Sequence, residues 1–154
     1  RAKQLMVHRG VAPLVLVPDY AVSTELARSL QPASVPYEDA VFNVSRAALL
    51  VAALVQSPEL LFEATEDRLH QDYRASAMPP TAGLVRALRD AGHAAVVSGA
   101  GPSILVLAAD PTQRAVAAAI AADRHDASWR ALNLAVDFKG ATVNPRRVDA
   151  TATP

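Results

Sequence analysis

Two short apolar runs joined by a glycine-rich loop constrain this chain more than any other stretch. Ala94–Val97 and Ile104–Ala108 are rich in residues that favour strands, and Ser98–Ser103 between them reads SGAGPS. An ordinary hairpin needs only a two-residue turn such as Asn-Gly. This loop is longer, and its small residues lower the steric barrier to close approach by another molecule. The pattern predicts an antiparallel hairpin whose loop is either a tight Gly-Pro turn or a ligand contact.

Further strands and helices are predicted on both sides of this hairpin. Val11–Pro18 is an apolar run closed by proline, and the segment ALNLAVDFKGATV from Ala131 alternates apolar and polar residues; each predicts a strand. Apolar periodicity and capping residues predict helices over Ser23–Leu30, Tyr37–Gln56, Pro58–His70, Ala82–Ala91 and Pro111–Arg124. The segment between the third and fourth of these helices, YRASAMPPTAG, is expected to be a connector.

This order of elements predicts an α+β fold. One strand, four helices, a hairpin, a helix and a final strand favour a four-stranded antiparallel sheet with helices packed mainly on one face. The arrangement that fits is ferredoxin-like, a split βαβ. We expect residues 1–154 to form one domain, with a frayed tail over residues 144–154.

Composition excludes several classes of function. Fifteen Lys and Arg residues balance fifteen Asp and Glu residues, and aromatic residues make up 5% of the chain, so nucleic-acid binding is not favoured. Cysteine is absent, which excludes disulfides and cysteine nucleophiles. The longest apolar run, Ala47–Val55, has nine residues, against about 20 needed to cross a bilayer. The four histidines never stand three or four residues apart, so no metal site is predicted.

Two arginines are candidates for binding an anion. Arg28 lies on the first predicted helix, and Arg74 follows the segment EDRLHQDY. A converging pair of arginines would suit a carboxylate through bidentate hydrogen bonds. Each alone is more simply a solvated surface charge, and spacing in the sequence does not show convergence. The acidic residues Glu63, Glu66 and Asp67 are expected to form a solvated helix face.

Four segments between Val11 and Ala109 carry the pattern of a known family. They read VPDYAVSTELARSLQP, YEDAVFNVSRAALLVAAL, EDRLHQDYRASAMP and VVSGAGPSILVLA. In this order and spacing they resemble the C-terminal domain of homoserine kinases, within the GHMP family of small-molecule kinases. The motif GAGPS is shared by all GHMP kinases, whereas the other segments are more specific to homoserine kinases.

The resemblance implies a reaction and a set of site residues. The reaction is ATP-dependent phosphorylation of the L-homoserine hydroxyl to O-phospho-L-homoserine in threonine biosynthesis, with Mg²⁺. Arg28 and Arg74 match two arginines that hold the substrate carboxylate, and Thr24 matches a catalytic threonine near the transferred phosphate. The loop residues that would line the cleft opposite the ATP phosphates are Gly99, Ala100, Gly101, Pro102 and Ser103.

Two departures from the family pattern stand out. Asp72 occupies a position where relatives often carry Pro, so an acidic side chain there would either weaken the field of Arg74 or point to solvent. The family's phosphate-binding loop and the acidic region that positions Mg²⁺ are absent from these residues, and both belong to the N-terminal domain. ATP and Mg²⁺ are therefore expected to be bound mainly by that domain. The chain, which lacks an initiating Met, is expected to be inactive alone.

The expected partners are L-homoserine, ATP and the protein's own N-terminal domain, with no nucleic acid and no membrane, in the cytoplasm. Members of the family are often homodimers, and no stretch of this sequence identifies an interface. Two alternatives stay open. One is another GHMP kinase, acting on mevalonate, a sugar or a cytidyl-isoprenoid alcohol; the other is a non-catalytic ferredoxin-like module for ligand binding or dimerisation.

Overall fold

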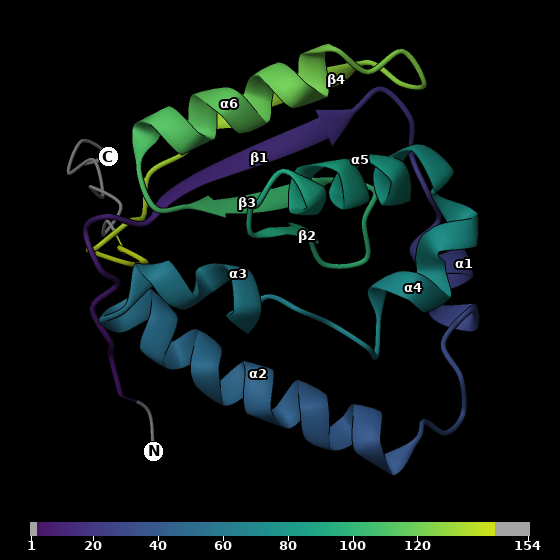
Figure 1. Ribbon diagram of the computed structural model, residues 1–154, viewed down its shortest axis with the longest axis horizontal. Helices are drawn as coiled ribbons and strands as arrows, with labels where there is room; N and C mark the ends of the chain where they lie inside the picture. The colour runs from purple at the N-terminus through teal and green to yellow at the C-terminus, as the bar shows by residue number, and fades with distance from the viewer. Residues whose placement is uncertain (1–2, 144–154) are drawn as a thin grey trace, which may run out of the picture.

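The computed structural model describes residues 3–143, so the tail expected at 144–154 lies outside the described residues. The elements in chain order are β1 (Ala12–Pro18), α1 (Thr24–Ser29), α2 (Tyr37–Val55), η1 (Pro58–Leu60), α3 (Leu61–Ala64), α4 (Gln71–Arg74), η2 (Ala75–Ala77), α5 (Pro79–Asp90), β2 (Ala95–Val97), β3 (Ile104–Ala108), α6 (Pro111–Ala122) and β4 (Trp129–Asn133). The strands form one sheet in the order β2-β3-β1-β4, and all neighbours are antiparallel (Figure 1). This order confirms the predicted ferredoxin-like α+β fold.

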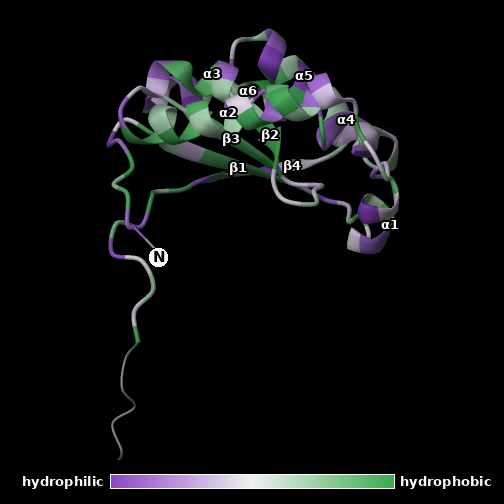
Figure 2. Cartoon of the chain, turned by 90° about the horizontal axis from the view of Figure 1, so that it is seen from below, coloured by the Kyte–Doolittle hydropathy of each residue, from purple (hydrophilic) through white to green (hydrophobic). Residues whose placement is uncertain are grey.

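The helices cover one face of the sheet. Figure 2 shows α2, α3, α5 and α6 on this side, while the opposite face has no helix packed across it. Successive side chains of a strand point to opposite faces. Fully buried side chains therefore alternate along the central strands and point into the helix layer: Leu14, Leu16, Ile104 and Val106. Their neighbours Val15 and Leu105 lie on the other face and are partly exposed.

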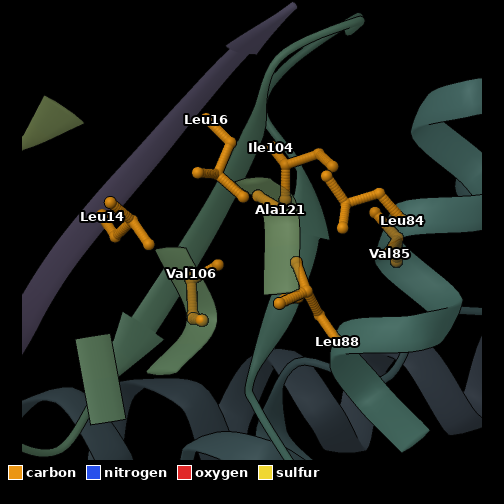
Figure 3. Close-up of a cluster of buried hydrophobic side chains, with 10 residues drawn as sticks. Leu14, Leu16, Leu84, Val85, Leu88, Ile104, Val106 and Ala121 are labelled. Carbon is orange, nitrogen blue, oxygen red and sulfur yellow. The ribbon is translucent and has the colours of Figure 1, made fainter. Parts of the chain in front are cut away.

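The main core lies between the central strands and two helices. Leu84 and Leu88 of α5 are fully buried against the sheet, and Figure 3 shows them facing Ile104 and Val106. Ala121 of α6 closes the same cluster. Because these helices belong to the β1–β2 and β3–β4 crossovers, their burial against one face holds all four strands in register.

Several local signals in the sequence place the ends of helices correctly. The Ser23 hydroxyl accepts a hydrogen bond from the backbone N–H of Leu26 at the start of α1, 3.4 Å away. The Asp110 carboxylate accepts one from Gln113 N–H at 2.9 Å and begins α6. Gly92, with φ +84°, follows the end of α5 in the left-handed conformation that glycine favours.

The third predicted helix and the connector after it are wrong. Only η1 and α3 form within Pro58–His70, because the Thr65 hydroxyl donates back to the carbonyl oxygens of Leu61 and Phe62 and the chain then turns. The residues expected to be a connector contain the end of α4, η2 and the first turn of α5. Helix α5 begins at Pro79, since proline is well suited to the first helical position.

The last predicted strand is displaced toward the N-terminus. β4 covers Trp129–Asn133, and its last residue, Asn133, lies opposite Leu14. Trp129 shares the buried face with Pro18 and packs against the core, whereas Leu132 lies on the opposite face. Leu134 and Phe138, two of the apolar residues in the alternation that predicted this strand, lie beyond the end of β4 and are 45% and 44% exposed.

Some apolar side chains on helix α2 are exposed. Val44 is 70% exposed and Val51 is 51% exposed. The described part of the chain, residues 3–143, contains no helix that combines the length and the apolar character needed to cross a membrane.

The core assignment predicts a difference between two aliphatic side chains. Leu84→Ala removes a side chain that is 0% exposed and should lower the free energy of unfolding by about 2–5 kcal/mol, because the cavity cannot fully collapse. Val116→Ala, at a position 49% exposed on α6, is the control and should change it by much less. Urea denaturation followed by circular dichroism measures both; equal losses would contradict the described core.

Candidate functional site

The loop between β2 and β3, residues 98–103, is closed by its own backbone. Ser98 N–H donates to the Ser103 carbonyl at 2.8 Å, and Gly101 N–H donates to the Ser98 carbonyl at 3.1 Å. Gly99 has φ +62° and Gly101 has φ +83°, conformations that residues with a Cβ rarely adopt. The Gly101–Pro102 peptide bond is cis. This 98–103 loop is therefore an ordered turn.

The two glycines of the loop serve different purposes. A Cβ at Gly101 would lie 2.6 Å from Met78 Sδ and 3.0 Å from Val97 Cγ1. The Gly101 backbone therefore packs against the side chains of Met78 and Val97. A Cβ at Gly99 would meet nothing within 4 Å, and Gly99 is exposed. Gly101 thus anchors the loop, while Gly99 leaves open space on its outer side.

Helix α4 holds the loop through two hydrogen bonds. Arg74 Nη1 donates to the Gly99 carbonyl at 3.2 Å, and the Gln71 side-chain oxygen accepts from Val97 N–H at 2.7 Å. Arg74 Nε is buried and has no hydrogen-bond partner within residues 3–143. A hollow of about 400 Å³ adjoins this arginine and is lined by Asp67, His70, Gln71, Arg74, Val96, Val97 and Gly99. A buried donor without a partner beside a hollow is the expected state of a group that binds a ligand.

Asp67 positions α4. Its carboxylate accepts hydrogen bonds from the Asn43 side chain and from three backbone N–H groups at 2.7–3.1 Å, those of Leu69, His70 and Gln71. Burial opposes ionisation of the Asp67 carboxyl and would raise its pKa. The hydrogen bonds, above all the one from Gln71 N–H, favour the ionised form and outweigh burial, so the pKa of Asp67 is lowered below its ordinary value. The expected solvated acidic face is therefore wrong for Asp67. Glu66 also departs from it, since it forms an ion pair with Arg46 at 2.8 Å.

Thr24 and Arg28 lie on α1. Thr24 is the first residue of this helix, and both side chains are exposed. α1 and α4 occupy the same end of the molecule in both views (Figures 1 and 2). The Gln31 side-chain nitrogen lies 3.0 Å from His70 Nδ1, which ties the end of α1 to the residue before α4. The structure thus joins Arg74 to the 98–103 loop and places the helix of Arg28 beside them.

Asp72 points away from Arg74. Its side chain is exposed and lines the cleft between α2 and α5, whereas Arg74 lines the hollow beside Gly99. The two residues stand two apart on a short helix, where side chains do not face each other.

The cleft between α2 and α5, about 630 Å³, is larger than the hollow beside Arg74, but three of the arginines that line it, Arg46, Arg68 and Arg89, already have partners. Arg46 pairs with Glu66, and both Arg46 and Arg68 stack on the Phe42 ring. Arg89 donates to the Phe62 carbonyl at 2.9 Å. These contacts hold helices together, so we place the candidate site at the 98–103 loop instead.

Comparisons with known proteins identify the family of this chain. Residues 47–126 match the family model described as GHMP kinases C terminal, which is more than half of the chain. The chain belongs to the GHMP kinase C-terminal family. Within this family, it is 68% identical over 152 residues to the homoserine kinase of Leifsonia xyli, and 70% identical over 141 residues to that of Clavibacter michiganensis. These relatives confirm the resemblance predicted from the sequence.

The matches also define how much of a GHMP kinase is present. The alignments cover 99% and 92% of this chain but only 47% and 45% of the two relatives, so the chain spans just under half of their length. The crystal structure of homoserine kinase from Cytophaga hutchinsonii superposes with a TM-score of 0.74 at 23% identity, over 84% of this chain and 43% of that one. This likeness supports the fold.

The hydrogen bonds of Asp67 predict a pH-dependent contribution to stability. Because its pKa is lower in the folded state, the contribution is present above the unfolded pKa and is lost as pH falls through the folded value, that is, below about pH 4. Asp67→Asn should lower the free energy of unfolding at pH 7. Between pH 7 and pH 3, the free energy of unfolding should fall less in this variant than in the wild type. Urea unfolding at a series of pH values measures this, with exposed Glu63→Gln as the control. Parallel pH curves for wild type and Asp67→Asn would contradict it.

Crowding at Gly101 predicts a second effect on stability. Gly101→Ala and Gly92→Ala carry the same positive-φ strain, at +83° and +84°, but only the first meets Met78 and Val97. Gly101→Ala should therefore cost about 1–3 kcal/mol more than Gly92→Ala, because overpacking adds to the strain. Thermal unfolding of the two variants compares them directly; equal losses would mean that the Met78 side chain moves aside freely.

Proposed function

We propose that this chain is the C-terminal, substrate-binding part of a homoserine kinase, which transfers a phosphoryl group from ATP to the hydroxyl of L-homoserine. Two homoserine kinases align with 99% and 92% of this chain at 68% and 70% identity, which supports this assignment. The structural observation that carries it is the guanidinium of Arg74 beside the 98–103 loop, with a buried Nε that has no partner in the described chain.

Arg74 would bind the carboxylate of the amino-acid substrate. Nη1 is occupied by the Gly99 carbonyl, so the Nε side of the guanidinium is the side available to a ligand. Charge-assisted, bidentate hydrogen bonds through that side suit a carboxylate. A neutral alcohol without a carboxylate would leave Nε as unpaired as it is in the free chain and would not gain this hydrogen bond.

α1 would supply the second half of the clamp. We assign Arg28 as the second carboxylate ligand and Thr24 as the residue near the transferred phosphate. The exposed positions of both side chains and the Gln31–His70 contact between α1 and the α4 region support these roles. Two fixed cations would aim the hydroxyl toward the phosphoryl group, and phosphoryl transfer depends chiefly on such positioning.

Gly99, Ala100, Gly101, Pro102 and Ser103 would line the cleft opposite the ATP phosphates. The absence of a side chain at Gly99, whose outer side is open, lets a phosphate or a second domain approach the backbone closely. ATP supplies the phosphoryl group, and Mg²⁺ would neutralise its charge. We assign both mainly to the N-terminal half, which carries the family's phosphate-binding loop.

The protein's own N-terminal half is the proposed partner. Leu5 and Met6 are 51% and 59% exposed, and Met6 lines a hollow together with the 44%-exposed Phe138. Exposed apolar side chains gathered in one place favour contact with another surface. We expect the chain alone to be inactive, because the proposed reaction needs ATP-binding groups that we assign to the N-terminal half. The homodimer and the cytoplasmic location stay predictions.

The substrate assignment predicts a selective loss of activity in the full-length protein. Arg74→Ala should lower kcat/KM for homoserine by roughly 30- to 900-fold, because a charge-assisted clamp contributes about 2–4 kcal/mol. Arg86→Ala removes an equal charge from an exposed position of α5 and should have little effect. Steady-state assays of ATP turnover with homoserine, mevalonate and galactose measure both.

If the wild-type protein prefers mevalonate or galactose to homoserine, the substrate assignment would be rejected and only membership of the GHMP family would stand. Homoserine turnover that is unaffected by Arg74→Ala would reject the carboxylate clamp. Absence of kinase activity in the full-length protein would favour a non-catalytic ligand-binding module.

A further inference from the structure

A buried hydroxyl connects three segments around the 98–103 loop. Thr81, in the first turn of α5, is 0% exposed. Its Oγ1 donates to the Pro102 carbonyl at 2.7 Å and lies 2.6 Å from the Tyr20 hydroxyl oxygen. Thr81 N–H also donates to that hydroxyl oxygen, at 3.2 Å. Tyr20 and Pro102 are far from Thr81 in sequence, so these contacts exist only in the fold.

The direction of every hydrogen bond in this network follows from its atoms. A carbonyl oxygen can only accept, so the single Thr81 hydroxyl proton goes to Pro102. The Tyr20 hydroxyl must then donate to Thr81 Oγ1, and it accepts from Thr81 N–H. Each hydroxyl proton therefore has a single orientation that satisfies all three hydrogen bonds. A fully satisfied hydrogen-bond network of this kind makes the residues in it rigid.

The network joins the two parts of the proposed site. Tyr20 lies in the connection from β1 to α1, which carries Thr24 and Arg28. Pro102 belongs to the 98–103 loop. Met78, 1% exposed and one residue before α5, packs under Gly101 in the same place. Met78 and Thr81, at the start of α5, therefore both contact the 98–103 loop. Thr81 also holds Tyr20, so the beginning of the β1–α1 connection is fixed relative to the loop.

We propose that Thr81 is a positioning residue for phosphoryl transfer, and that its hydroxyl, together with Tyr20, sets the distance between the 98–103 loop and α1. The proposal rests on the function proposed above. Thr81 is fully buried, which leaves it no surface for contact with a substrate. It acts through Pro102 and Tyr20, so that substrate held from α1 meets the phosphoryl group at the loop in the required geometry.

Thr81→Val tests the hydroxyl in the full-length protein, because valine keeps the shape and removes the proton and the acceptor. It leaves the Pro102 carbonyl without its donor, which favours a shift of the loop. Displacement of about 1 Å costs up to roughly 100-fold in rate for reactions that depend on positioning. We therefore expect kcat for homoserine to fall about 10- to 100-fold, with KM changed less than threefold.

Two further variants separate positioning from stability. Thr81→Ser keeps the hydroxyl and should restore kcat to within about threefold of wild type, although it loses a buried methyl group. Tyr20→Phe removes both the donor to Thr81 Oγ1 and the acceptor of Thr81 N–H, and should lower kcat by an intermediate factor. In the Thr81→Val background, Tyr20→Phe should lower kcat by a smaller factor than it does in the wild type, since both act on one network. Melting temperatures are measured for all variants.

The outcomes distinguish this proposal from the function on which it rests. Wild-type activity with kcat unchanged in folded Thr81→Val and Tyr20→Phe, and only melting temperature lowered, would overturn the positioning role and leave the kinase assignment intact. Loss of kcat in Thr81→Ser equal to that in Thr81→Val would also overturn it. If Thr81→Val does not fold, Tyr20→Phe decides the question through the same kcat-against-KM split. A wild type inactive toward homoserine would reject the proposed function itself.

Discussion

Burial of a single face of the sheet is the constraint on which the rest of this structure depends. Leu14, Leu16, Ile104 and Val106 must be covered, and α5 and α6 cover them from one side. Because both crossovers return over the same face, the strand order becomes β2-β3-β1-β4. That order brings the β2–β3 loop, the exit from β1 and the start of α5 to one end of the sheet, where the candidate site lies.

Polar contacts from residues 67–81 then organise this end. Asp67 caps the approach to α4, Arg74 holds the Gly99 carbonyl, and Thr81 holds the Pro102 carbonyl. Each contact involves a backbone group that would otherwise be unpaired in a tight loop, which is why side chains are needed there. The segment thus binds one side of the loop to the domain and leaves the Gly99 side open.

Under the proposed function, the N-terminal half would lie on the open side of the candidate site, in keeping with membership of the GHMP kinase C-terminal family. The chain corresponds to just under half of the homoserine kinases that it matches. Phosphoryl transfer needs its groups positioned on both sides of the reacting phosphate. If the proposed function is right, an ordered loop with one open side is the part of such a site that this chain contributes.

The sequence by itself determined the local features: the hairpin, the ends of α1, the C-terminal end of α5, the start of α6, the one-sided sheet, and the family to which the segments belong. These follow from apolar periodicity, capping residues and short motifs, which act over a few neighbouring residues. Only the tertiary structure decided the rest. Asp67 is half-buried and accepts from Asn43, β4 covers Trp129–Asn133 instead of beginning at Ala131, and Thr81 meets Tyr20 and Pro102. These contacts depend on partners distant along the chain, and no local pattern records which partner a buried polar group will find. The turn after Thr65 involves only the nearby carbonyl oxygens of Leu61 and Phe62, which apolar periodicity does not record.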